Sequence, residues 1–245
     1  MTSDITACYY TANRIPDCIG VPVRNALLES TRPLGIPIVS VSHQPIDLGT
    51  NVCVGPNPIC VLTLYRQVLI AAQHARTEFV ALCEDDCLYP PSHFTSYRPP
   101  DLQTFAYNQH KWTVLAWESN PILSNKLDRC VLSQCIAPRL ELIAALSERF
   151  EHIRLGTLDQ DQIDRHFAEP GRYERWMGVT IRNKVQYSDP DPTIIICHLH
   201  ASIDQLGKRK RHGDIRTQTC NPWGSAEDII RKYVGEDEWH RERTA

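Results

Sequence analysis

The sequence predicts a single-domain α/β protein built on a mixed, mostly parallel sheet flanked by helices. Strand-like and helix-like stretches alternate through the N-terminal half, and residues 79–83 form a continuous apolar run, as in a strand buried on both faces. A chain of 245 residues is long enough to bury a large core. Its 42% apolar and 22% charged residues are typical of a globular protein. Since no internal repeat or low-complexity linker divides the chain, one domain is the simplest interpretation.

Elements in the N-terminal half follow from apolar patterning. Apolar, β-branched stretches predict strands at 5–10, 36–41 and 79–83, and helical spacing predicts helices at 23–30 and 62–76. The turn-rich segment 42–58 is predicted to be a long loop, and long loops in compact domains are often functional. The strand at 79–83 runs directly into acidic residues, which places them at its carboxyl end, where ligands bind in open α/β sheets.

The C-terminal half is predicted to be mixed. Apolar runs predict strands at 111–117, 131–137 and 193–197. A helix over 137–151 has Pro138 in its first turn and is expected to place Leu140, Ile143, Leu146 and Phe150 on one face. Residues 225–245 are expected to form a short surface helix.

The ten cysteines are expected to be unpaired and mostly buried, because most of them lie inside apolar segments. Cys83 and Cys87 have the spacing of half a zinc site, but no CxxC pair accompanies them. No secretory leader and no apolar run long enough to span a bilayer is seen, so a cytoplasmic protein with no membrane partner is expected. The net charge of −3 argues against a generic polyanion binder.

Three carboxylates, Glu84, Asp85 and Asp86, follow the apolar run directly. Neighbouring carboxylates repel each other, and an unpaired buried charge is expensive. The triplet is therefore either a solvated turn or a cation site. Carboxylate oxygens suit a hard cation such as Mg²⁺ or Mn²⁺, and such a cation can hold a diphosphate.

Two further groups of residues have a chemical and a plain interpretation. His198 and His200 alternate at the end of an apolar strand and so share one face; they are either ordinary histidines or ligands that join the acidic triplet. The basic run 208–212 lies between Gly207 and Gly213. It is a solvated loop, a mobile loop that closes over a diphosphate, or a stripe that follows nucleic-acid phosphates.

Two stretches, taken in order, resemble a known family. ITACYYTANRIPD supplies a first strand and loop, and LTLYRQVLIAAQHARTEFVALCEDD supplies a helix that leads into a short apolar strand ending in carboxylates. Over about residues 4–170 this order resembles the GT-A-fold glycosyltransferases, in which a DxD-type motif ends that strand. Glu84-Asp85-Asp86 occupies the place of the motif, with Glu84 where aspartate is more common.

The resemblance implies a Rossmann-related, GT-A-like domain over 1–225 and a C-terminal tail over 226–245. Its nucleotide-sugar half covers about 1–100, and its acceptor half covers 101–225. It implies that Glu84 and Asp86, with His198 or His200, bind a divalent cation, Mn²⁺ or Mg²⁺, that bridges the diphosphate of a nucleotide sugar, with a UDP-sugar as first choice. The donor-binding residues that it implies are Tyr10, Thr11, Asn13, Arg14, Arg66, Asp85, Lys208 and Arg209.

The resemblance also suggests a catalytic base. Many inverting members carry an acidic base at the start of a helix, and the stretch LDQDQIDRHF resembles that region. Asp161 matches best and Asp159 is the reserve, although an aspartate at this position also caps a helix. The base would remove a proton from an acceptor hydroxyl, which then attacks the anomeric carbon. A retaining reaction stays open, because no nucleophile is identified.

The acceptor has several candidates. The chain resembles small bacterial or phage transferases, some of which glycosylate 5-hydroxymethylpyrimidines in DNA; the location would then be the host cytoplasm. A patch facing double-stranded DNA is predicted at Lys210, Arg211, Arg172, Arg175 and Trp176, with Tyr173 beside them to stack on a base. A glycan or small-molecule acceptor is the alternative. A non-enzymatic nucleic-acid-binding module and a metal-dependent nuclease or nucleotidyltransferase are the other classes considered.

Overall fold

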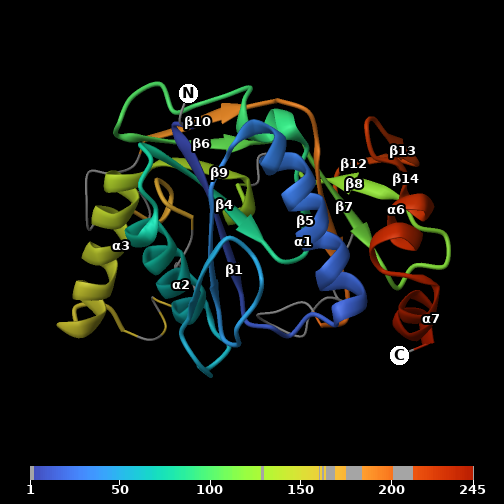
Figure 1. The fold of residues 1–245 in the computed structure, drawn as a ribbon, viewed down its shortest axis with the longest axis horizontal. Coiled ribbons are helices and arrows are strands. Elements are labelled where there is room, and N and C mark those ends of the chain that lie inside the picture. The colour runs from blue at the N-terminus through green and yellow to red at the C-terminus, as the bar shows by residue number, and fades with distance from the viewer. Residues whose placement is uncertain are drawn as a thin grey trace.

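A seven-stranded sheet forms the centre of the protein (Figure 1), in the order β10-β6-β9-β4-β1-β2-β3. The computed structural model describes residues 3–127, 130–159, 161, 163, 169–174, 184–200 and 212–244, and structural statements below refer to these residues. The strands of this sheet are β1 (Ile5–Thr11), β2 (Ile38–Ser42), β3 (Thr50–Cys53), β4 (Phe79–Glu84), β6 (Thr104–Asn108), β9 (Cys135–Pro138) and β10 (Lys184–Ser188).

The direction of the strands confirms the mixed, mostly parallel sheet that the sequence predicts. β1 pairs in parallel with both β2 and β4, and β2 pairs in parallel with β3, while β9 runs antiparallel between β4 and β6. The chain therefore moves outward from β1 to β3 and then returns to add β4 on the other side of β1. At such a reversal of strand order, open α/β sheets form a crevice outside the carboxyl ends of the strands.

Helices cover both faces of the central sheet (Figure 1). Side chains alternate along β1: Cys8 and Tyr10 pack in the core formed with α2 (Val61–His74) and α3 (Arg139–Arg154), whereas Ala7 and Tyr9 pack in a core that includes Leu27 of α1 (Asp17–Thr31). This alternation is the period of two expected of a strand. Both faces of β1 are buried, which explains why its sequence is apolar at almost every position.

A second sheet adjoins the first, in the order β12-β8-β7-β11-β5. Its strands are β5 (Cys87–Leu88), β7 (Lys111–Leu115), β8 (Leu123–Asn125), β11 (Thr193–Cys197) and β12 (Ile215–Thr217). A short ribbon of β13 (Thr219–Cys220) and β14 (Gly224–Ser225) leads to the C-terminal helices α6 (Ala226–Tyr233) and α7 (Glu236–Thr244). Three short 3-10 segments complete the described elements, at Arg32–Leu34, Pro91–Phe94 and Leu132–Gln134.

The C-terminal segment forms two helices where the sequence predicts one. Ser225 caps α6 in a capping box with Asp228, which defines the start of the helix. Ile229 and Ile230 of α6 and Trp239 of α7 are buried in the same core as the second sheet. These helices therefore pack against the body of the protein through an apolar face.

Several predicted boundaries differ from the structure. α1 begins at Asp17, six residues before the predicted start, because Pro22 is accommodated inside the helix near its first turns. The predicted loop 42–58 contains β3, an edge strand whose side chains are only partly buried. The predicted strand 131–137 divides into a 3-10 turn and β9. Such short or edge elements carry little apolar periodicity, and the sequence signal for them is correspondingly weak.

The buried face of α3 agrees with the prediction only in part: Leu146 is buried, and Ile143 and Phe150 pack partly buried against the same core. Leu140 has an exposed fraction of 69%, while Leu142, Ala145, Leu146 and Arg149 are buried. The buried face of α3 includes Arg149, and a pattern of apolar residues does not predict a buried arginine. A buried Glu174 partners this arginine, and the pair compensates for the charge.

The cysteines behave largely as expected. All ten are unbridged; seven are buried, and Cys18, Cys53 and Cys60 are exposed. None of the helices in the described part of the chain has the length and apolar content needed to cross a bilayer.

Candidate functional site

The acidic turn, defined as Glu84, Asp85 and Asp86, lies between β4 and β5 and joins the two sheets. The Glu84 backbone N–H donates to the Tyr89 hydroxyl at 2.9 Å. The Ile196 N–H of β11 donates to the Asp86 carbonyl at 2.8 Å. The backbone of the turn is therefore held in place, while its three side chains remain partly exposed.

The end of β1 supplies hydroxyl groups to two of these carboxylates. The Tyr10 hydroxyl donates to Glu84 Oε1 at 3.0 Å, and Thr11 Oγ1 donates to Asp85 Oδ2 at 2.5 Å. Burial raises the pKa of the Asp85 carboxyl, against the opposing effects of the Thr11 hydrogen bond and the Arg24 charge. Ionised Asp85 is therefore costly in the protein alone, and a nearby dication would stabilise it.

A small cavity of about 50 Å³ opens beside the acidic turn. Its wall is formed by the end of β1, the start of α2 and the residue that follows β2. The Gln67 side chain of α2 donates to the Thr11 carbonyl at 2.8 Å and to the Val41 carbonyl at 3.3 Å. This amide holds the carboxyl ends of β1 and β2 at fixed positions around the cavity.

His43 is a site residue that the sequence analysis missed. It follows β2 directly, lines the cavity and has an exposed fraction of only 7%. Within the described part of the chain its Nε2 atom is buried and has no hydrogen-bond partner. Burial lowers the pKa of the imidazole, so the ring is neutral and one nitrogen is left for a ligand. Its place at the carboxyl end of a strand is the signal that could have indicated it.

Cys60 was also missed, although it lines the cavity at the N-terminus of α2. Its Sγ lies 3.4 Å from Thr63 Oγ1. The pKa of the thiol is lowered: burial raises it, but hydrogen bonds from Thr63 and Leu62 outweigh that effect. The donors at this helix start thus favour a negative group in this part of the cavity.

The predicted loop after β1 has a defined conformation. Asn13 adopts a left-handed backbone with φ of 54°, its N–H donates to Thr11 Oγ1 at 2.9 Å, and its side-chain oxygen accepts from the Gln44 N–H at 2.9 Å. Tyr10 and Thr11 line the cavity beside the acidic turn, and Asn13 lines a neighbouring one with Arg24. Asparagine tolerates this backbone region better than most residues, which explains its use here.

The other predicted donor residues lie elsewhere or outside the described residues. Arg14 is partly buried next to this loop. The Arg66 guanidinium lies over the Phe150 ring of α3, with 5.5 Å to the ring centroid. Lys208 and Arg209 fall in 201–211, which is not described.

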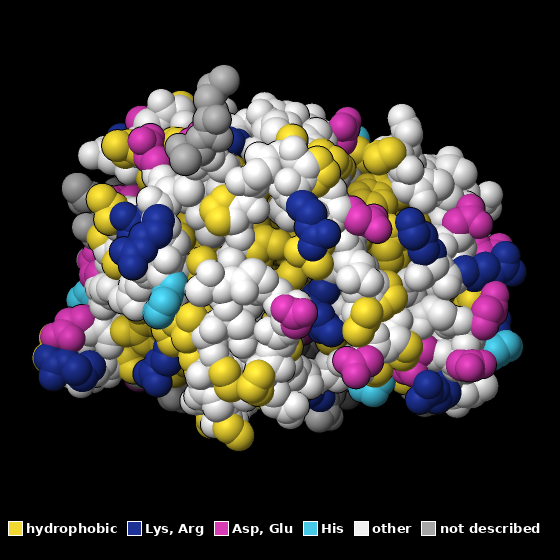
Figure 2. Space-filling view, viewed as in Figure 1, with side chains coloured by type: hydrophobic (Ala, Val, Ile, Leu, Met, Phe, Trp, Pro, Cys, Tyr) yellow, Lys and Arg dark blue, Asp and Glu magenta, His cyan; other side chains and the backbone are white. Residues whose placement is uncertain are grey.

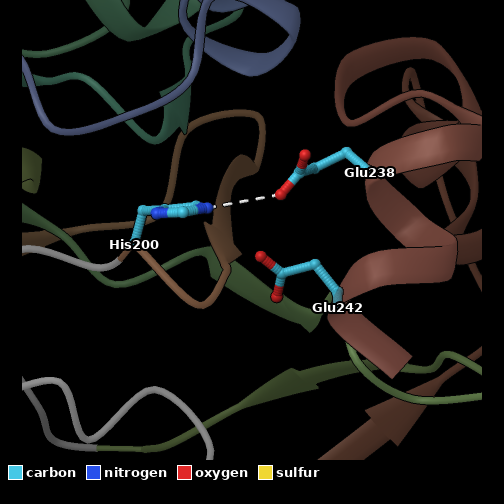
Figure 3. A group of neighbouring side chains, drawn as sticks. All are labelled: His200, Glu238 and Glu242. Carbon is cyan, nitrogen blue, oxygen red and sulfur yellow. Dashed lines mark hydrogen bonds and ion pairs between the residues drawn. The ribbon is translucent and has the colours of Figure 1, made fainter. Parts of the chain in front are cut away.

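The two predicted histidine ligands follow β11, a strand whose backbone bonds to the acidic turn. Ile196, which bonds to the Asp86 carbonyl, is two residues before His198. His198 Nδ1 accepts the His200 N–H at 3.1 Å, so a neutral ring carries its proton on Nε2 as a donor. The His200 ring instead points to α7, where Nε2 lies 3.3 Å from Glu238 Oε1 (Figure 3).

The predicted base and acceptor residues are only partly described. Asp159 and Asp161 are both exposed, and the Asp159 carbonyl accepts the Ile163 N–H. Arg172 is partly buried, while Tyr173 is fully buried beneath Arg149, whose guanidinium is 4.2 Å from the ring centroid. Tyr173 is therefore not available to stack on a base. Outside the described residues lie Arg175, Trp176, Lys210 and Arg211.

The surface seen in Figure 2 mixes charges of both signs. Lys and Arg side chains alternate with Asp and Glu side chains over this face, without a large region of one sign. This agrees with the net charge of −3. Among the described residues on this face, there is no continuous basic stripe of the kind that follows a DNA backbone.

Comparisons with known proteins give only distant similarities. No protein-family model matches the chain, and no curated protein matches it in sequence. Among solved structures, S. aureus TarS 1-349 in complex with UDP is similar at 10% identity and a TM-score of 0.44, over 81% of this chain and 61% of that one. The complex of TarS 1-349 with UDP-GlcNAc gives 11% identity and a TM-score of 0.43, over 87% and 60%.

This chain thus spans about 60% of the length of the TarS chains that it resembles. At this identity and these TM-scores, the TarS structures do not decide the activity of this chain. The fold description rests instead on the strand order and directions given above, and the site description rests on the contacts around the acidic turn.

Proposed function

We propose that the protein is a metal-dependent glycosyltransferase that moves a sugar from a nucleotide-sugar donor, a UDP-sugar in the first place, to an acceptor hydroxyl. One observation carries the proposal: three adjacent carboxylates lie at the carboxyl end of β4, beside β1, where the strand order reverses and a cavity opens. This is the position at which open α/β sheets bind nucleotides.

The residues of the acidic turn fit a divalent cation. Glu84 and Asp86 offer carboxylate oxygens, the ligand type that Mg²⁺ and Mn²⁺ prefer. A cation held there would offset the negative charge of a departing nucleotide diphosphate. The Tyr10 hydroxyl holds Glu84 by a hydrogen bond, and the Thr11 hydroxyl holds Asp85.

The remaining cavity residues suit the nucleotide. In this proposal the neutral His43 ring hydrogen-bonds the base through Nε2, and the loop 11–14 lies along the ribose and phosphates. Asp85 faces the donor sugar or ribose. His198, with a donor on Nε2, is placed near the same turn to contact a phosphate oxygen or, in its other tautomer, the cation.

For the chemical step, Asp161 is the proposed base and Asp159 the reserve. Either would accept the proton of the acceptor hydroxyl as oxygen attacks the anomeric carbon and the bond to the diphosphate breaks. Both carboxylates are exposed, so a base at this position would become active only when an acceptor covers it.

The proposal also names an acceptor. We propose the hydroxyl of a 5-hydroxymethylpyrimidine in DNA, with a glycan or small-molecule hydroxyl as the alternative. Most of the residues that would face DNA lie outside the described part of the chain, so the acceptor is best separated from the donor in the test.

The donor test uses the full chain with UDP-glucose, UDP-GlcNAc and UDP-galactose, each with Mn²⁺, with Mg²⁺ or with EDTA. UDP release and UDP affinity are measured. We expect binding and release with a cation and a large loss of both with EDTA. The test variant is Asp86→Asn in the acidic turn. Its matched control is Asp189→Asn, which changes an exposed aspartate in the loop after β10.

A UDP affinity that is the same with and without a cation, and the same in Asp86→Asn as in the wild type, would overturn the metal assignment. Release of pyrophosphate, or cutting of DNA, would instead indicate a nucleotidyltransferase or nuclease. Once a donor is found, hydroxymethylated and plain DNA are compared as acceptors; equal rates with both would reject the DNA acceptor.

A further inference from the structure

A group of side chains of the types that ligate metals lies between α7 and the segment that follows β11 (Figure 3). One ligand atom from each of His200, Glu238 and Glu242 lies within 4.8 Å of the other two. His200 comes from the turn after β11, and the two glutamates lie four residues apart on α7. This spacing puts both carboxylates on the same face of the helix.

The burial of the two carboxylates is unusual. Glu238 has an exposed fraction of 2% and Glu242 of 1%, although glutamate is rarely buried to this extent. Two carboxylates this close together repel each other more strongly when protein, rather than water, surrounds them. A dication between them would turn this repulsion into attraction.

A hydrogen bond and an ion pair hold the two carboxylates in place. The Leu199 N–H donates to both Glu242 oxygens, at 2.6 and 2.7 Å, and the Arg241 guanidinium lies 2.8 Å from Glu238 Oε2. Glu238 Oε1, the other oxygen, is the atom that faces His200. Metal-binding carboxylates are commonly oriented by such second contacts.

We propose that His200, Glu238 and Glu242 form a divalent-cation site that fastens α7 to the end of β11. One imidazole nitrogen with two carboxylate oxygens suits Zn²⁺ or Mn²⁺ better than Ca²⁺. The site is separate from the acidic turn in its ligands, and His200 belongs to it. The His200 side chain is 42% exposed, which gives the cation a path from solvent.

Cys18 lies at the edge of this site but is not assigned as a ligand. Its Sγ lies 3.9 Å from Glu238 Oε2, which is the oxygen that faces Arg241. The other oxygen of Glu238, Oε1, is the one that faces His200. Cys18→Ser is therefore expected to leave the metal affinity unchanged. A strong loss in this variant would make Cys18 a fourth ligand and overturn the three-ligand assignment.

The test separates this site from the acidic turn by using Asp86→Asn as the background. The full chain, without a histidine tag and stripped with chelator, is titrated with Zn²⁺, and calorimetry and the thermal midpoint are recorded. We expect one equivalent to bind and to raise the midpoint. Adding His200→Ala should weaken the affinity roughly 100-fold, whereas adding His74→Ala, at an exposed histidine on α2, should not.

Co²⁺ gives a second readout that does not depend on activity. The absorption bands of bound Co²⁺ are expected in the Asp86→Asn protein and should disappear when His200→Ala is added. Since His200 is partly exposed, this variant is expected to fold, which circular dichroism checks. Failure of the Asp86→Asn protein to bind Zn²⁺, or equal binding with and without His200, would overturn the proposal and leave a network of His200, Glu238 and Arg241 ion pairs.

Discussion

Two acidic groups in this protein have opposite surroundings. Glu174 is fully buried, its Oε1 lies 2.5 Å from the Arg149 guanidinium, and its Oε2 accepts the Gly171 N–H at 2.7 Å. Glu84 and Asp85 in the acidic turn are partly exposed at a cavity, and each accepts a hydrogen bond from a hydroxyl group.

The difference separates a structural charge from a candidate functional one. The Arg149–Glu174 pair is neutral as a whole and is enclosed by the rings of Tyr65 and Tyr173, at 5.5 and 4.2 Å from the guanidinium carbon. The acidic turn keeps its negative charge concentrated at a cavity that can admit a ligand. The following predictions test this contrast, from the largest expected effect to the smallest.

Breaking the buried pair should affect stability most. Arg149→Met leaves the Glu174 carboxylate buried without its main partner, and we expect a loss of about 3–5 kcal/mol in the free energy of unfolding. Urea unfolding followed by circular dichroism measures it. The double variant Arg149→Met, Glu174→Leu removes both charges and should be more stable than the single one. A single variant whose free energy of unfolding is within about 1 kcal/mol of that of the wild type would show that the pair is not structural.

Changing the acidic turn should affect activity and not stability. Asp86→Asn keeps the shape of the side chain but removes a charge that holds the cation in the proposed function, so we expect turnover to fall roughly 100- to 1000-fold. UDP release under saturating donor and Mn²⁺ measures the loss, and Asp189→Asn is the control. Wild-type turnover in Asp86→Asn would place the chemistry elsewhere.

Asp85 should show a trade between stability and binding. Its pKa is raised by burial, so the stability that it contributes is complete below the unfolded pKa and is lost as the pH rises through the folded pKa. Asp85→Asn should therefore raise the thermal midpoint of the ligand-free protein at neutral pH, and the gain should vanish near pH 3. Donor affinity should fall roughly 30-fold, as for a lost charged hydrogen bond.

The thermal midpoint of Asp85→Asn is measured from pH 3 to pH 8, and donor affinity by calorimetry. A variant that is less stable than the wild type at neutral pH would contradict the assigned direction of the pKa. Unchanged donor affinity would remove Asp85 from the donor site.

His43 should have a smaller effect, confined to donor binding. His43→Phe fills a similar volume but offers no nitrogen, so the KM for the donor should rise roughly tenfold while kcat changes little. Because a buried nitrogen without a partner is removed, the ligand-free variant should be no less stable than the wild type. His43→Gln, which retains hydrogen-bonding atoms, is the matched control; equal KM values for both variants would exclude a contact through Nε2.

The smallest effect is expected on the outer face of α3. Leu140 is exposed, so Leu140→Lys should change the free energy of unfolding by less than about 0.5 kcal/mol. Leu142→Ala, two residues further on the buried face, should cost about 2–5 kcal/mol. Similar losses in both variants would contradict the orientation of the helix.

The sequence predicts the parallel core well because β1 and β4 are buried on both faces and so are apolar without interruption. The position of the acidic turn follows from the same signal, since a carboxylate triplet after such a strand is conspicuous. His43 is different: it has no neighbouring motif, and only the three-dimensional arrangement of the described residues shows that it lines the cavity and that its buried Nε2 has no hydrogen-bond partner.

Partners far apart in the sequence explain the other misses. Arg149 breaks the apolar stripe of α3 and is understood only with Glu174, while His200 meets two glutamates that lie 38 and 42 residues later. β3, β12 and β14 are short and partly exposed, so their sequences lack a clear period of two. Their pairing depends on contacts that local patterning does not encode.

The hydrogen bond between Ile196 and the Asp86 carbonyl has a mechanical consequence. β4 belongs to the central sheet, β5 and β11 belong to the second sheet, and the acidic turn connects the two sheets. In the proposed function, a donor bound at this turn would be attached to both sheets at once, so a tilt of one sheet against the other would change the angle at which the bound sugar is presented.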